Sequence, residues 1–269
     1  MEPLLGPTAD DRLHVMTYNL RYPADDPGHL WEERRPAMAA LLNLERPAMI
    51  GVQEGYVHQL RDVVADLPAG YDWIGEGRDG GDRGECTAIV YDGTRLGALR
   101  YAHFWLSDTP DVPGSATWGN SVPRMATWVR FHDTATGGEF VVLNTHLDHR
   151  SADARRKAAS LLAARLESFG AVPVVVTGDF NAAAGISAAY DSLVSGTGLS
   201  DAWCVARRRL TPEYATYGGY RTPVLDRPRI DWILTTADIE TEAIAINPNM
   251  IDGRYPSDHL PVHAHVRLP

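Results

Sequence analysis

Six short polar clusters, five of them at the end of an apolar run, constrain the fold of this chain more than any other feature. The clusters are Met16-Thr17-Tyr18-Asn19, Val52-Gln53-Glu54, Asn144-Thr145-His146-Leu147-Asp148, Thr177-Gly178-Asp179-Phe180-Asn181, Pro256-Ser257-Asp258-His259 and, inside a further run, Arg229-Ile230-Asp231-Trp232. The runs carry β-branched and aromatic residues, which is typical of strands. Because rigid scaffolds deliver functional side chains from strand ends, we expect the clusters to meet at one rim.

The same pattern predicts many strands and few helices. The predicted strands are Leu13–Leu20, Met49–Glu54, Tyr71–Gly75, Thr87–Tyr91, Leu99–Leu106, Met125–Phe131, Phe140–Leu147, Val174–Thr177, Ile230–Leu234, Ala243–Ile246 and Leu260–Leu268. Helical spacing of apolar residues predicts helices over Pro36–Glu45, His58–Leu67, Ala152–Phe169 and Ser187–Val194. Strands mixed with few helices favour an α/β (α+β) fold in which two sheets pack together and helices lie outside.

Two polar patterns predict solvent-facing surface. In the last predicted strand, apolar residues alternate with His263, His265 and Arg267, so we expect these three side chains to form a solvated face. The pair Arg34-Arg35 is interpreted as a surface charge cluster near the start of a helix.

Length and charge limit the classes of protein that remain. With 269 residues and no repeat or linker, the chain is expected to form a single domain over residues 1–269. Its 25 basic and 35 acidic residues give a net charge of −10, which argues against tight, sequence-independent binding to long nucleic acid. No secretory signal and no membrane-spanning apolar run is visible, so we expect a soluble cytoplasmic protein of undetermined oligomeric state. Cys86 and Cys204 fit two reduced thiols, although a disulfide stays open.

The residue types in the polar clusters favour chemistry at phosphate. The clusters supply carboxylates, carboxamides and two histidines, which are hard oxygen ligands and acid–base groups. Such a set suits Mg²⁺ or Mn²⁺ and an attacked phosphate better than thiol, flavin or nicotinamide chemistry.

In this order the clusters resemble those of the endonuclease/exonuclease/phosphatase superfamily, over nearly the whole chain from Met16 to Val262. The stretch Phe104–Ser115 (FWLSDTPDVPGS) is similar to a bacterial subgroup whose substrates are poorly defined. The resemblance implies a four-layered α/β sandwich, with two mixed β-sheets face to face and helices on the outer faces. It also implies hydrolysis of a phosphoester by in-line attack of water, with one or two Mg²⁺ or Mn²⁺ ions as cofactors.

The resemblance also assigns roles to single residues. Glu54 and Asp258 match metal-binding positions, and Asn19 matches a residue that positions the metal or the reacting phosphate. Asp179 matches the residue that orients or deprotonates the attacking water, and Asn181 matches a donor to the phosphate.

Two carboxylate–histidine pairs are implied as well. His146 matches a histidine that binds the scissile phosphate or protonates the leaving oxygen, and Glu85 falls at the position of its acidic partner. His259 matches a contact to the phosphate and the activated water, and Asp231 matches the residue that orients it. Each pair would be an acid–base device worth roughly 10²–10⁴-fold in rate. Whether Asp179 or His259 is the base stays open.

Two long irregular segments, Ser107–Arg124 and Cys204–Arg227, are expected to be ordered binding loops, because they carry aromatic and arginine side chains. Arg124 is a candidate for bidentate phosphate binding, although a surface arginine fits equally well. Tyr217 lies in a segment similar to a family loop beside the active site, and it is a candidate for stacking on a sugar or base.

Three substrate hypotheses follow. A small phosphorylated metabolite, as a monoester or diester, is favoured by the acidic net charge and the absence of a basic stripe. A nuclease or abasic-site endonuclease acting on DNA or RNA is the alternative that the family at large suggests. A catalytically silent binding protein on the same fold is the third, and the complete set of matched positions argues against it.

Overall fold

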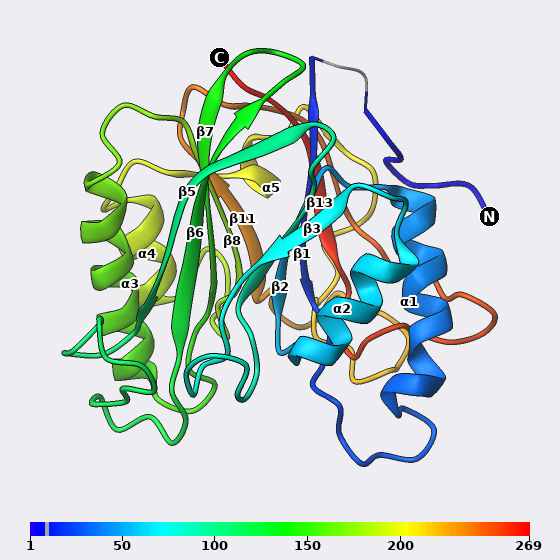
Figure 1. Cartoon of the computed structure of the whole chain (residues 1–269), viewed down its shortest axis with the longest axis horizontal. Coiled ribbons are helices and arrows are strands. Elements are labelled where there is room, and N and C mark those ends of the chain that lie inside the picture. The colour runs from blue at the N-terminus through cyan, green and yellow to red at the C-terminus, as the bar shows by residue number, and fades with distance from the viewer. Residues whose placement is uncertain (9–10) are drawn as a thin grey trace.

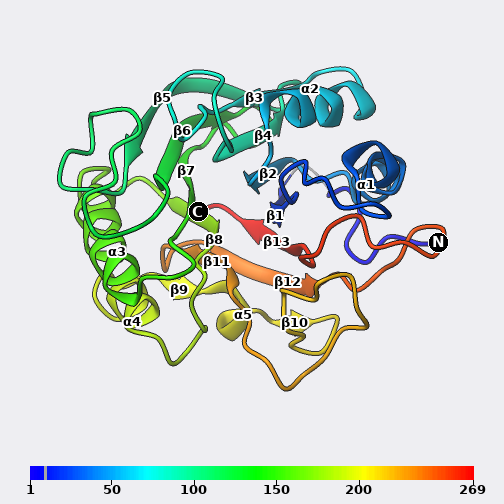
Figure 2. The same cartoon turned by 90° about the horizontal axis from the view of Figure 1, so that it is seen from below.

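The computed structural model describes residues 1–8 and 11–269, which form two mixed β-sheets packed face to face (Figures 1 and 2). The first sheet has seven strands in the order β10 (Arg208–Arg209), β12 (Glu240–Ile246), β13 (Val262–Arg267), β1 (Leu13–Asn19), β2 (Met49–Gln53), β4 (Ala88–Asp92) and β3 (Tyr71–Ile74). The second has six, in the order β5 (Leu96–Trp105), β6 (Met125–Asp133), β7 (Glu139–His146), β8 (Val174–Asp179), β11 (Asp231–Thr235) and β9 (Ser200–Asp201).

Helices cover the outer face of each sheet. α1 (Trp31–Glu45) and α2 (Val57–Asp66) share a buried apolar cluster with β1, β2 and β4. α3 (Ala152–Glu167) and α4 (Ala188–Val194) share another with β7, β8 and β11, and the short α5 (Ala202–Val205) packs into the core between the sheets. This arrangement confirms the predicted four-layered sandwich. Within the described residues, no helix has both the length and the apolar character needed to cross a membrane.

The central strands of each sheet are buried on both faces. The other sheet covers one face, and helices cover the other. In β1, Leu13 and Val15 face the core between the sheets, whereas Met16 and Tyr18 belong to the cluster under α1 and α2. In β8, Val175 lies between the sheets and Val176 packs towards α3 and α4. This double burial explains why the predicted strands could be recognised as continuous apolar runs.

The boundary of the first helix differs from its prediction. The sequence predicts a start at Pro36, but α1 begins five residues earlier at Trp31, where the Leu30 backbone N–H donates to Glu33 Oε2 at 3.0 Å. That side-chain bond satisfies a donor at the helix start. The short β9, β10 and α5 were not predicted, because two-residue strands and a four-residue helix are too short to show periodicity.

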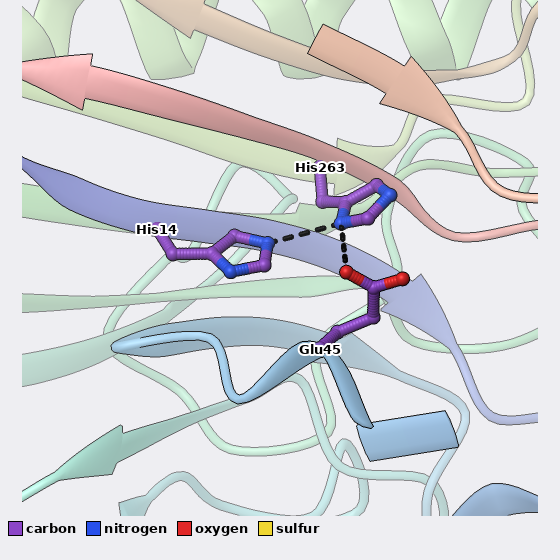
Figure 3. Close-up of side chains that lie close together, drawn as sticks. All are labelled: His14, Glu45 and His263. Carbon is purple, nitrogen blue, oxygen red and sulfur yellow. Dashed lines mark hydrogen bonds and ion pairs between the residues drawn. The ribbon is translucent and has the colours of Figure 1, made fainter. Parts of the chain in front are cut away.

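The prediction of a solvated face on the last strand is wrong for His263. Its side chain is fully buried, and His265 is partly buried. Figure 3 shows His263 next to His14 and Glu45. The Nε2 atom of His14 lies 3.0 Å from Nδ1 of His263. The N-terminal residues cover this face, because the backbone N–H groups of Leu4, Leu5 and Gly6 all donate to the Glu45 carboxylate.

A polar layer crosses the apolar core directly below the end of the sandwich. Asn144 on β7 accepts from Gln53 Nε2 at 2.8 Å and from Thr177 Oγ1 at 3.1 Å, and its own amide donates to the backbone oxygens of Val52 and Ala88. A Cβ atom on Gly51 would lie 2.0 Å from Thr177 Oγ1, so the two sheets approach this closely only with glycine there. These bonds fix β2 against β7 and β8.

Candidate active site

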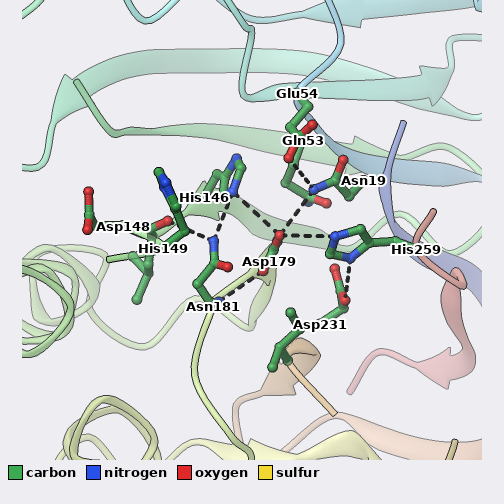
Figure 4. A network of polar contacts seen from close by, with 12 residues as sticks. Asn19, Gln53, Glu54, His146, Asp148, His149, Asp179, Asn181, Asp231 and His259 are labelled. Atoms are coloured by element: carbon green, nitrogen blue, oxygen red, sulfur yellow. Dashed lines mark hydrogen bonds and ion pairs between the residues drawn. The ribbon is translucent and has the colours of Figure 1, made fainter. Parts of the chain in front are cut away.

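The polar clusters meet at one end of the sandwich, as the sequence predicts. Parallel pairing sets Asn19 beside Gln53 and His146 beside Asp179, and antiparallel pairing sets Asp231 beside Asp179. Figure 4 shows these side chains converging from different strands. A cavity of about 560 Å³ opens here, and its walls include the predicted site residues Glu54, Glu85, Arg124, His146, Asp179, Asn181, Tyr217, Asp258 and His259.

Backbone strain marks the ends of the strands that build this cavity. Arg21, Glu54 and Asn181 line it, and their φ angles are 55°, 64° and 47°. Residues other than glycine rarely adopt this left-handed region, and such strain is concentrated at functional sites. The strained turns direct the Glu54 and Asn181 side chains into the cavity rather than continuing the strands.

Asn19 links the two carboxylates at the centre of the site. Its Nδ2 atom donates to Glu54 Oε1 and to Asp179 Oδ2, both at 3.0 Å, and its Oδ1 atom accepts from the backbone N–H of Arg21 at 2.9 Å. The second oxygen of Glu54 accepts from the backbone N–H of Tyr22 at 3.1 Å. Asn19 is therefore buried behind the cavity wall, where it spaces Glu54 from Asp179.

The donor set fits a divalent cation. At this end of the sandwich, two groups of the described residues each bring ligand atoms within 4.8 Å of one another: Glu54, His146 and Asp179, and also Asp179, Asp231 and His259. Burial, followed by the negative charge of Asp231, raises the pKa of Asp179 to about 7. Such a shift indicates crowded carboxylates, and a divalent cation beside them would offset the repulsion.

Asp258, another predicted metal ligand, has a different partner. Its Oδ2 atom accepts from Arg21 Nη1 at 2.7 Å, so an arginine holds this carboxylate at the cavity wall. Arg21 lies two residues after Asn19, the last residue of the first polar cluster, and this position was the available signal.

The Asp231–His259 pair is confirmed. Asp231 Oδ2 lies 2.9 Å from His259 Nδ1, and His259 Nε2 faces Asp179 Oδ2 at 3.8 Å. Burial alone lowers the pKa of His259, but the carboxylates of Asp231 and Asp179 raise that pKa well above its ordinary value. We therefore treat His259 as protonated, with Nδ1–H donating to Asp231 and Nε2–H directed towards Asp179.

The expected pairing of Glu85 with His146 is wrong. Arg124 takes that place, since its Nη1 atom lies 2.8 Å from His146 Nδ1. Burial, and next the charge of Arg124, hold the pKa of His146 well below its ordinary value. Because an arginine can only donate, His146 Nδ1 accepts and the ring proton resides on Nε2, which lies 3.4 Å from Asp179 Oδ2 and 3.1 Å from Asn181 Nδ2. His146 is thus a neutral hydrogen-bond donor.

Glu85 belongs instead to an arginine cluster. Its Oε2 atom accepts from Arg78 Nη1 at 2.6 Å and lies 3.8 Å from Arg124 Nη1. Burial, and then the charge of Glu54, raise the pKa of Glu85 to about 7. Arg124 also contacts His149, with 3.0 Å between Nη2 and Nδ1. The predicted surface role of Arg124 is excluded, because this side chain is buried at the cavity floor.

Several cavity residues were not predicted from the sequence. Arg21, Tyr22, Tyr56 and Arg78 line the cavity, as does His149, which the sequence suggests is a solvated loop residue. His149 directly follows a predicted cluster, and Tyr22 and Tyr56 lie three and two residues after one, so their place in the sequence was a usable signal. Arg78 lies far from every cluster, so the sequence held no such signal for it.

Arg34 is a buried scaffold residue rather than part of a surface charge cluster. Its guanidinium donates to the backbone oxygens of Leu20, Arg21, His29 and Pro256 and is fully buried. These carbonyls belong to the turns after β1 and before Asp258. Arg34 therefore ties together two of the loops that carry site residues.

A two-sheet sandwich with this set of carboxylates and histidines at one end defines a phosphoesterase. The chain belongs to the endonuclease/exonuclease/phosphatase family, whose sequence pattern it matches over residues 16–259. That span runs from the first polar cluster to His259, and it contains every predicted site residue.

Solved structures of similar proteins agree with this assignment. An endonuclease/exonuclease/phosphatase family protein from Bacteroides thetaiotaomicron is 32% identical, with a TM-score of 0.90 and coverage of 96% of this chain and 98% of that one. A mannosyl-6-phosphatase from the same organism is 33% identical, with a TM-score of 0.88 and coverage of 94% and 99%.

A curated viral protein is also similar in sequence. An uncharacterized protein of Acanthamoeba polyphaga mimivirus is 29% identical over 161 residues. The match covers 56% of this chain and 59% of the viral protein, so the chain spans little more than half the length of that relative.

Proposed function

We propose that this protein is a divalent-metal-dependent phosphomonoesterase acting on a small phosphorylated metabolite, with a sugar phosphate as the leading candidate. The observation that carries the proposal is the mixed charge of the cavity lining. The carboxylates of Glu54 and Asp179, which Asn19 bridges, line the cavity together with the guanidinium groups of Arg78 and Arg124. A metal ion and two arginines together match the charge of a phosphate monoester.

Cavity size and net charge favour a small substrate over a long nucleic acid. About 560 Å³ lies within the usual range for sites that hold small molecules. The net charge of −10 repels polyanions at long range. The similarity to a mannosyl-6-phosphatase over 94% of the chain supports a sugar phosphate in the same way.

Glu54 and Asp179 are the residues we assign to the metal ion, which when bound would neutralise charge on a phosphate oxygen. Asp179 is held by Asn19 Nδ2 and by the backbone N–H of Asn181 at 2.9 Å. In this position its carboxylate takes a proton from the water whose oxygen bonds to phosphorus. Protonated His259, oriented by Asp231, donates to a phosphate oxygen.

The contact with Arg124 changes the role expected of His146. A neutral imidazole that accepts at Nδ1 is a poor proton donor, so we assign its Nε2–H to a hydrogen bond with the phosphate. As the new P–O bond forms and the ester P–O bond breaks, the leaving oxygen then takes its proton from solvent through the open cavity.

A hydrolysis panel on the purified protein tests this function. It would compare mannose 6-phosphate, glucose 6-phosphate and a mononucleotide with plasmid and single-stranded DNA, in Mg²⁺, Mn²⁺ and chelator. Asp179→Asn is the blank, because it keeps the shape of the side chain but lowers its capacity to take a proton. We expect inorganic phosphate from the small esters, lost in chelator and in the variant. Nicking or shortening of DNA without release of phosphate would overturn the proposal in favour of a nuclease.

A further inference from the structure

A second cavity of about 540 Å³ adjoins the site, and Tyr217 lines both cavities. Its walls come from residues 215–227, within one of the two long loops, and from Met250 and Tyr255. The sequence predicts a binding role for this loop and makes Tyr217 a candidate for stacking on a sugar or base. The inference below rests on the proposed function, since it concerns the part of the substrate that does not react.

The loop is fixed to the active site rather than lying free on the surface. The backbone N–H groups of Gly218 and Gly219 donate to the Asp258 carbonyl oxygen at 2.8 and 3.0 Å, and Leu260 N–H donates to the Thr216 carbonyl oxygen at 2.7 Å. Thr216 Oγ1 also accepts from the backbone N–H of Asp231 at 3.1 Å. The second cavity therefore keeps a constant position relative to Asp258 and Asp231.

Two arginines give this cavity its charge. Arg221 and Arg227 line the wall, and among the described residues neither forms an ion pair with a carboxylate. Both side chains are exposed, so their guanidinium groups are free to meet a ligand in the cavity. By contrast, Arg229, two residues after Arg227, is buried and bonds Asp201 at 2.6 Å.

Aromatic and hydroxyl groups complete the lining. Tyr217 is 46% exposed and its ring lies 5.1 Å from that of His259, so this side chain forms the border between the two cavities. Tyr220 stacks on His29 with ring centroids 3.7 Å apart, and its buried hydroxyl has no hydrogen-bond partner. The exposed ring of Tyr217 suits stacking on a sugar ring or another ring.

We propose that the second cavity binds a second anionic group of the substrate, a phosphate or a carboxylate, through Arg221 and Arg227. The reacting phosphate binds in the first cavity, while Tyr217, at the border of the two cavities, contacts the ring that joins the two groups. The preferred substrates are then doubly anionic small molecules, and singly phosphorylated sugars react with a higher KM.

Substrates with one or two anionic groups test whether the second cavity binds a second anionic group. Mannose 6-phosphate carries one anionic group, mannose 1,6-bisphosphate adds a phosphate, and 6-phosphogluconate adds a carboxylate. In the wild type we expect a KM at least about 10-fold lower for one or both doubly anionic compounds, as charge-assisted bidentate bonds provide. The double variant Arg221→Gln/Arg227→Gln should lose that advantage and keep its kcat and KM for mannose 6-phosphate.

A control variant removes two positive charges outside both cavities. Arg61→Gln/Arg100→Gln changes two arginines that line neither cavity, so it should keep the wild-type preference. Which doubly anionic compound gains tells whether the second group is a phosphate or a carboxylate. An absence of preference in the wild type, or a preference that survives in the Arg221/Arg227 variant, overturns the proposal.

Binding without turnover separates this proposal from the proposed function. Calorimetric titration of Asp179→Asn protein with mannose 1,6-bisphosphate should show affinity that falls about 10-fold when Arg221 and Arg227 are also replaced. If binding follows this rule while no compound is hydrolysed, the second cavity is supported and the phosphomonoesterase assignment fails. If turnover of mannose 6-phosphate is normal and bisphosphate binding does not change, the second cavity fails alone.

Discussion

His263 should make the stability of this protein depend on pH in a range where most soluble proteins are stable. Its side chain is fully buried beside His14 and Glu45, and burial, followed by the charge of His265, lowers the pKa of His263 from 6.5 to about 3. Burial and then His263 lower the pKa of His14 as well. The Glu45 carboxylate cannot readily reverse this, since it already accepts from three backbone N–H groups and from Asn247.

The sign follows from which state binds the proton. Below about pH 6.5 the unfolded chain protonates this histidine, whereas the folded chain keeps it neutral until about pH 3. The contribution of neutral His263 to the free energy of unfolding is therefore complete above about pH 6.5. It decreases as the pH falls from 6.5 towards 3. One such group changes the free energy of unfolding by about 1.4 kcal/mol per pH unit, or about 2 kcal/mol between pH 6.5 and 5. His14 acts in the same direction.

Urea unfolding followed by tryptophan fluorescence at pH 7, 6 and 5 measures the effect. His263→Gln keeps a hydrogen-bonding side chain but removes the titration, so its free energy of unfolding should depend less on pH by about 1.4 kcal/mol per unit. His58→Gln, which removes an exposed histidine, should behave like the wild type. Equal pH slopes for the wild type and His263→Gln would refute the reasoning, and they would fit the solvated strand face that the sequence suggests.

Three further changes test the site and its support. Asp231→Asn should lower the pKa of His259, seen by NMR titration of the ring, and reduce kcat by roughly 10²-fold or more; an unchanged titration would remove the pair from the mechanism. Arg124→Gln should raise the pKa of His146, because the charge that opposes protonation is lost; the same NMR titration decides this without a substrate. Gly51→Ala should destabilise the fold by about 1–3 kcal/mol in urea, because its Cβ would meet Thr177 at 2.0 Å; wild-type stability would show that the sheets can separate there.

Sequence patterns predicted the elements whose signal is local. Strands buried on both faces are continuous apolar runs, and a polar cluster at the end of such a run marks a rim, so Glu54, His146, Asp179 and His259 were placed together correctly. The partner of His259 was predicted from the family resemblance, and Asp231 sits at the first position of β11. Register then brings Asp231 beside Asp179 on the neighbouring strand.

The wrong predictions concern side chains whose neighbours come from segments far away in the sequence. His263 alternates with apolar residues as a surface residue would, and nothing local shows that residues 4–6 cover it. Arg34 lies in a helix start that looks solvated, yet the loops after β1 and before Asp258 close around its guanidinium. In both cases the covering segment is far away in the sequence, so periodicity carries no information about it.

The contact of His146 with Arg124, instead of the expected contact with Glu85, has the largest consequence for mechanism. With a carboxylate at Nδ1, His146 would be a charged acid; with a guanidinium there, it is a neutral donor. The positive charge that would have resided on His146 lies instead on Arg78 and Arg124, which cannot lose their protons at any working pH. His259 then remains the one histidine of the pair whose proton can respond to the chemistry. Acid–base function is thus concentrated on the Asp231–His259–Asp179 side of the cavity, and the Arg124 side contributes fixed positive charge.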